Sequence, residues 1–135
     1  MKRTRALAVA GLLAVCVAAG AGPAAAADEE LLPHPGPDGL VWVPVWTGPG
    51  GVASAGAWGT LPTVVTVACA GGGTADVTLH SAAGLAAAFT VDCPVGATGT
   101  GSAAVAPGVV EGAFDVGVRT SSGTIRWGLT VVQPE

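Results

Sequence analysis

Five segments of this chain alternate apolar and polar side chains, and this alternation limits the possible folds more than any other feature of the sequence. The segments cover residues 63–70, 75–80, 85–93, 112–120 and 124–132. A period of two sends successive side chains to opposite faces of an extended strand, whereas an amphipathic helix repeats every 3.6 residues. The pattern therefore predicts half-buried antiparallel strands and an all-β fold.

The apolar phase of each segment predicts the core. The inward residues are expected to be Val65, Val67, Cys69, Val77, Leu79, Leu85, Ala87, Phe89, Val91, Cys93, Phe114, Val116, Val118, Ile125, Trp127, Leu129 and Val131. Residues 71–73, 81–84 and 96–101 are rich in small turn-forming residues and are expected to connect the strands. The last two segments are expected to pair as a hairpin with Val116 opposite Trp127.

A further strand is expected at residues 41–46, where three valines alternate with Trp42, Pro44 and Trp46. Proline cannot donate a ladder hydrogen bond, so this strand is an edge strand or an extended arm. Residues 47–60, which include Trp58, are rich in glycine and are expected to be irregular. The sequence thus predicts a small antiparallel β-sandwich of about six to seven strands, immunoglobulin-like or a related Greek key.

The N-terminal residues have the pattern of an export signal. Lys2, Arg3 and Arg5 precede an apolar run over residues 6–19, and small residues then lead up to Ala27. A basic start, a short apolar centre and a small-residue cleavage site define a secretory signal peptide. The protein is therefore expected to be secreted and to act outside the cell.

Cleavage after residue 27 divides the chain into three parts. Residues 1–27 form the removed signal peptide, residues 28–40 an acidic tether rich in proline and glycine, and residues 41–135 a single β-sandwich domain. His34, between two prolines of the tether, is interpreted as a solvated residue. No stable membrane-spanning segment is expected in the mature form.

The composition of the mature chain favours folding and excludes two classes of partner. Val, Leu, Ile and Phe make up 25% of its 108 residues, which exceeds the level of roughly 20% below which disorder is expected. The mature chain has two basic residues, Arg119 and Arg126, and nine acidic residues, so its formal charge is −7. Two scattered cations cannot neutralise a row of phosphates, which argues against nucleic acids and anionic membranes as partners.

The cysteines predict one disulfide. Cys16 lies within the export signal, where a lipid attachment site is a minor alternative. Cys69 and Cys93 remain, and both fall in the core phase of their segments. Two strands flanking a third in one sheet lie about 9–10 Å apart, whereas a disulfide requires Cα atoms within about 7 Å. We therefore expect the Cys69–Cys93 disulfide to join two facing sheets.

No residue set indicates catalysis, a metal or a cofactor. Ser81 adjoins His80, but neighbours on a strand point to opposite faces and do not form a nucleophile–base pair. Asp76 and His80 share a face about 13 Å apart, which is too far for a hydrogen bond. No zinc, haem, nucleotide or phosphate-binding motif is present in the sequence. The protein is expected not to be an enzyme.

The tryptophans are the candidate ligand contacts. Trp42 and Trp46 are expected to project from one face about 13 Å apart, with Trp58 nearby. Such an aromatic pair can stack on sugar rings or anchor a protein, although it can also cover the open end of a small sandwich. The favoured function is extracellular binding of an unidentified protein or glycan.

The alternative function is inhibition of a secreted hydrolase through the segment between Pro94 and Pro107. In general type, the mature chain is similar to secreted scaffolds such as enediyne-binding apoproteins and small proteinaceous hydrolase inhibitors. It differs from those groups in its disulfides, because it has one predicted disulfide between cysteines 24 positions apart, whereas they carry disulfides in pairs.

Overall fold

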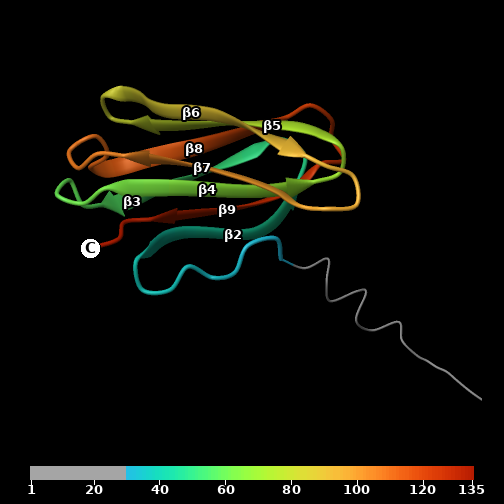
Figure 1. Cartoon of the computed structure of the whole chain (residues 1–135). Coiled ribbons are helices and arrows are strands. Elements are labelled where there is room, and N and C mark those ends of the chain that lie inside the picture. The colour runs from blue at the N-terminus through green and yellow to red at the C-terminus, as the bar shows by residue number, and fades with distance from the viewer. Residues whose placement is uncertain (1–29) are drawn as a thin grey trace, which may run out of the picture.

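The computed structural model describes residues 30–135, which form eight strands in two four-stranded antiparallel sheets (Figure 1). The strands are β2 (Gly39–Thr47), β3 (Gly50–Ala57), β4 (Thr63–Ala70), β5 (Gly73–Ser81), β6 (Gly84–Cys93), β7 (Gly99–Val105), β8 (Gly112–Thr120) and β9 (Arg126–Val132). The predicted all-β fold is confirmed, but the described residues form eight strands and not the six to seven that were expected. The predicted signal peptide lies outside the described residues. Among residues 30–135 no helix has the length and hydropathy needed to span a membrane.

The chain folds as one long hairpin rolled into two layers. β5 pairs with β6, β4 with β7, β3 with β8 and β2 with β9, so that the strand pairs are nested around the turn between β5 and β6. The sheet orders are β2-β9-β4-β7 and β3-β8-β5-β6. This nesting is the arrangement of an eight-stranded jelly roll, which consists of two Greek keys. The order differs from that of an immunoglobulin domain, in which consecutive strands A and B lie side by side.

Three expectations about the strands are wrong. Residues 47–60 are not irregular, because β3 occupies most of them and pairs with β8. β7 includes residues 99–101 of the turn expected at 96–101 and continues to Val105 within the segment expected to be a loop after Cys93. β8 and β9 do not form a hairpin, because the nested pairing places them in different sheets. Both missed strands are rich in glycine and alanine, and each therefore carries little of the apolar alternation that reveals a strand.

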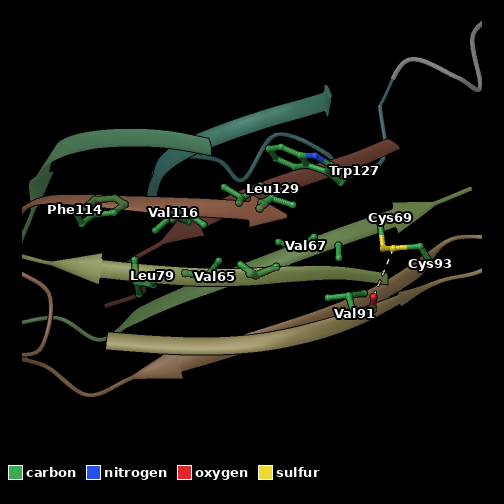
Figure 2. Packing of buried hydrophobic residues seen from close by; sticks show 14 of the residues in the cluster. Val65, Val67, Cys69, Leu79, Val91, Cys93, Phe114, Val116, Trp127 and Leu129 are labelled. Atoms are coloured by element: carbon green, nitrogen blue, oxygen red, sulfur yellow. Dashed lines mark hydrogen bonds between the residues drawn. A yellow bond between two sulfur atoms is a disulfide. The ribbon is translucent and has the colours of Figure 1, made fainter. Parts of the chain in front are cut away.

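The core lies between the sheets and contains the predicted apolar phases (Figure 2). Val65, Val67, Leu129 and Val131 are fully buried, and Trp127 lies among them with its Nε1 donating a 2.7 Å hydrogen bond to the Gly48 carbonyl. Buried nonpolar area of this kind contributes roughly 25 cal/mol per Å². The inner faces of both sheets therefore stabilise the fold mainly through these aliphatic and aromatic side chains.

Leu85 is an exception to the predicted core. Its side chain is 62% exposed, whereas Leu79 of the neighbouring strand is buried. The register of β5 and β6 shifts between Leu79 and His80, so Leu85 lies opposite His80. An extra residue in one strand reverses the phase of the residues beyond it. This bulge turns Leu85 to the outer face of the sheet.

The disulfide joins the two layers as expected. Cys69 of β4 and Cys93 of β6 lie in different sheets with Cα atoms 5.0 Å apart (Figure 2). Both side chains are almost fully buried. The bridge therefore closes one side of the core, where β6 and β7 lie against each other.

Candidate functional site

The structure places Trp42 on an edge strand, under the segment that precedes it. Its Nε1 donates a 3.0 Å hydrogen bond to the Leu32 carbonyl, and its ring meets that of His34 edge to face at 4.9 Å. The Leu31 N–H donates to the Pro44 carbonyl at 2.9 Å. Residues 30–38 therefore lie along β2 and partly cover Trp42.

Trp42 and Trp46 do not share a face, contrary to the sequence expectation. Trp42 lies opposite Thr130, but the register of β2 shifts after Val43, so Trp46 lies opposite the buried Trp127. Residues directly opposite each other in an antiparallel pair point to the same side. Trp46 consequently turns toward the open end of the sandwich, where it is 53% exposed. The bulge between Val43 and Trp46 removes the expected aromatic pair.

Trp58 is the most exposed of the three candidate tryptophans, at 68%, and its backbone is firmly held. The buried Gln133 side chain accepts a 2.8 Å hydrogen bond from the Trp58 N–H and donates a 2.9 Å bond to its carbonyl. The same amide donates to the Thr63 hydroxyl at 3.0 Å. β3 separates Trp58 from Trp46, and eight residues of strand span on the order of 25 Å. The three tryptophans therefore do not form one surface.

A different set of side chains gathers on the outer face of the β3-β8-β5-β6 sheet. In the register of β5 and β8, Asp76 lies opposite Arg119, Thr78 opposite Gly117 and His80 opposite Asp115. These residues alternate with buried valines and a leucine, so they point away from the core. We call the outer surface formed by Asp76, Thr78, His80, Asp92, Asp115, Gly117 and Arg119 the acidic face.

One hydrogen bond and one longer charge contact involve the carboxylates of the acidic face. The Thr90 hydroxyl donates a 2.7 Å hydrogen bond to Asp76 Oδ1. The Nδ1 of His80 lies 3.9 Å from Asp115 Oδ2, with the two side chains 46% and 60% exposed. At this exposure water screens the pair, and such surface pairs contribute about 0–1 kcal/mol. Both carboxylates therefore remain accessible to a partner.

The centre of the acidic face has little side-chain cover. Gly51 and Gly117 are paired across β3 and β8, and a Cβ at Gly117 would lie 3.2 Å from Thr78 Oγ1. A hollow of about 480 Å³ beside them is lined by Asp76, Thr78, Gly117 and Arg119 among others. A second hollow, of about 310 Å³, is lined in part by His80 and Asp115. The two hollows are separate, and each has charged side chains among its lining residues.

Sequence reasoning did not find this group because its members come from two strands that are far apart in the chain. The polar phases of both segments were visible, but which polar residues meet depends on the pairing of β5 with β8. The expected hairpin of β8 with β9 would have placed Asp115 diagonal to Arg126 instead. Asp115 and Arg119 are four positions apart, as are Asp76 and His80. This equal spacing was the only sign in the sequence that the two pairs could meet across neighbouring strands.

The acidic face contains acid–base groups with the hydroxyls of Thr78 and Thr90 beside them, but among the described residues no hydrogen bond joins a hydroxyl to His80. Ser81 follows His80 on β5 and therefore points to the other side of the strand, and its Oγ accepts a hydrogen bond from the Ala83 N–H at 3.3 Å. Within residues 30–135 no three His, Cys, Asp or Glu side chains gather where they could hold a metal ion. The arrangement can supply charge and hydrogen bonds to a ligand.

The segment expected to act as an inhibitory loop is mostly strand. β7 pairs with β4 along its whole length, from Gly99 opposite Cys69 to Val105 opposite Thr63. Only short connections remain on either side of it, and Val95 in the first of them is 82% exposed. An exposed loop for the inhibitor hypothesis would therefore be confined to the connections at residues 94–98 and 106–111.

Comparison of the chain with models of protein families, with curated protein sequences and with solved structures found no match. The residues and their geometry are accordingly the basis for a functional hypothesis.

Proposed function

We propose that this protein is a secreted, non-catalytic binding protein whose acidic face binds a basic segment of an extracellular protein. The observation that carries the proposal is the presence of exposed carboxylates on the outer face of one sheet, with Asp76 beside one shallow hollow, Asp115 beside a second, and Asp92 exposed on the adjoining strand β6. Carboxylates on an accessible surface attract and orient a cationic partner. Secretion is supported by the export-signal pattern and by the disulfide, since disulfides persist in oxidising compartments.

A protein partner is favoured over a glycan by the distribution of the aromatic side chains. Sugar rings stack on exposed aromatic faces, but Trp42 is partly covered and Trp46 and Trp58 lie at opposite ends of β3. The acidic face instead offers carboxylates with a net negative charge, in keeping with the charge of −7 expected for the mature chain. These groups complement lysine and arginine side chains.

The test compares two variants that lose the same charge from different places. D76N/D92N/D115N neutralises the acidic face, whereas E30Q/D38N/E135Q neutralises three exposed carboxylates elsewhere on the chain. The probes are fluorescein-labelled hexa-arginine and hexa-lysine peptides, with hexa-glutamate as the negative control, followed by fluorescence anisotropy. If each exposed ion pair contributes about 0.5 kcal/mol, the first variant weakens binding about tenfold. The second variant should bind nearly as well as the original protein.

Equal weakening by both variants would refute the proposal, because the attraction would then follow net charge and not the acidic face. No binding of either cationic peptide by the original protein at low salt would also refute it. Binding of a neutral polysaccharide panel, with the peptides inert, would assign the face to a glycan instead.

A further inference from the structure

Arg119 is an exposed cation in the middle of the acidic face. Within residues 30–135, neither an ion pair nor a hydrogen bond joins its guanidinium to another residue. Arg126, the other arginine of the described chain, lies on β9 in the opposite sheet. A guanidinium is always charged and presents its N–H donors in a planar fork that matches a carboxylate. Arg119 is therefore free to bind an anionic group of a ligand.

The carboxylate that faces Arg119 is held by a different partner. Asp76 lies opposite Arg119 in the pairing of β5 with β8, and opposite Thr90 in the pairing of β5 with β6. The Thr90 hydroxyl donates a 2.7 Å hydrogen bond to Asp76 Oδ1. Because β5 lies between β6 and β8, this bond directs the carboxylate toward β6 and away from Arg119. An anion and a cation thus lie on neighbouring strands without neutralising each other.

A hollow of about 480 Å³ contains both charges. Asp76 and Arg119 line it together with Thr78, Gly117 and residues of the turn into β3. Gly117 has no side chain to fill the space, and the Thr78 hydroxyl oxygen lies 3.2 Å from the point that a Cβ at Gly117 would occupy. We call this space the Arg119 hollow. It offers one ligand a carboxylate, a hydroxyl and a guanidinium.

A segment that carries only lysine and arginine side chains does not match the Arg119 hollow, because Arg119 repels them. The ligand needs an anionic group close to a cationic one. In an extended segment, neighbouring side chains point to opposite sides, so an acidic residue next to a basic one does not bring both charges to one hollow. A lysine or arginine at the C-terminus of a chain does, because it carries the α-carboxylate and the cationic side chain on one residue.

We propose that the Arg119 hollow binds the C-terminal residue of the basic partner, with its α-carboxylate on Arg119 and the Thr78 hydroxyl and its cationic side chain on Asp76. This inference rests on the proposed function, because it names the part of the partner that occupies the acidic face. Asp115 lies four residues from Arg119 on β8, about 13 Å away along the strand. A basic side chain about four residues before the C-terminus of an extended partner can therefore reach Asp115.

The test uses hexa-arginine, labelled with fluorescein at its N-terminus and made in two forms. One form has a free C-terminal carboxylate and the other a C-terminal amide, and fluorescence anisotropy at low salt measures the Kd of each. The amide form carries one more net positive charge, so general attraction to an acidic chain favours the amide. Binding through Arg119 favours the carboxylate form, by about three- to fivefold for one exposed ion pair.

Two variants locate the preference, and a third checks the geometry. R119Q should abolish the preference for the carboxylate form and should bind the amide form at least as tightly as the original protein does. R126Q removes the same charge from the opposite sheet and should keep the preference. R119K keeps the charge but not the planar fork, so its preference should be intermediate. Circular dichroism confirms that each variant is folded.

Equal binding of the two forms by the original protein, or tighter binding of the amide, would overturn this inference. It would leave the proposed function in place, since that requires only that cationic peptides bind through the acidic face. A preference that persists in R119Q, or that R126Q abolishes as R119Q does, would also overturn the inference. If neither peptide binds, both the proposed function and this inference fail.

Discussion

Removal of the Cys69–Cys93 disulfide should destabilise the protein by about 3.5 kcal/mol. The two residues are separated by 24 positions, so the bridge closes a loop of 25 residues. In the chain-entropy model, a loop of this length lowers the entropy of the unfolded chain by about 12 cal/mol/K, which corresponds to about 3.5 kcal/mol at 25 °C. For a domain of about 100 residues this lowers Tm by about 15–25 °C.

The measurement is urea unfolding of C69A/C93A against the original protein, followed by tryptophan fluorescence, which changes as the buried Trp127 becomes exposed to water. The original protein treated with reductant serves as the control, since it also loses the constraint and should approach the stability of the variant. A loss of less than about 1 kcal/mol would refute the reasoning. It would mean that residual structure keeps this loop compact in the unfolded chain or that the bridge strains the folded one.

Three further changes test the packing. Gln133→Ala should cost about 1–3 kcal/mol in urea unfolding, because it leaves three buried or partly buried hydrogen-bonding groups without the amide; an unchanged midpoint would show that water replaces it. Gly99→Ala should lower Tm clearly, because its Cβ would collide with the backbone of β6, whereas Gly56→Ala has open space and should change Tm little; equal effects would contradict the close approach of β6 and β7. Leu79→Ala should cost about 2–5 kcal/mol, and Leu85→Ala less than about 1 kcal/mol; a large loss at Leu85 would contradict the bulge in β6.

The strands with strong apolar alternation could be predicted, and the weakly patterned ones could not. Residues 63–70 and 112–120 match β4 and β8 in full, because bulky apolar side chains fall on every second position. β3 and β7 consist mainly of glycine, alanine, serine and threonine. Such residues form a strand only because a neighbouring strand pairs with them, so their local sequence gives little signal.

The candidate site, too, could be predicted from the sequence only in part. The outward phase of Asp76 and His80 follows from alternation alone, but their meeting with Arg119 and Asp115 depends on the nested pairing of β5 with β8. The expectation for Trp46 failed for a related reason. One extra residue in β2 reverses the phase of its side chain, and Pro44, which lies within that irregularity, is the only local sign of it, because proline in a strand marks an edge or a bulge.

By itself, the sequence determined that this chain makes antiparallel strands, which apolar residues other than Leu85 face the core, and that Cys69 and Cys93 join two sheets. These properties follow from local periodicity and from the short reach of a disulfide. Only the tertiary structure decided the jelly-roll order, the bulges and the composition of the acidic face. Strand pairing is a contact between distant parts of the chain, and several pairings bury the same apolar phases equally well. The choice among them depends on the packing of the whole core.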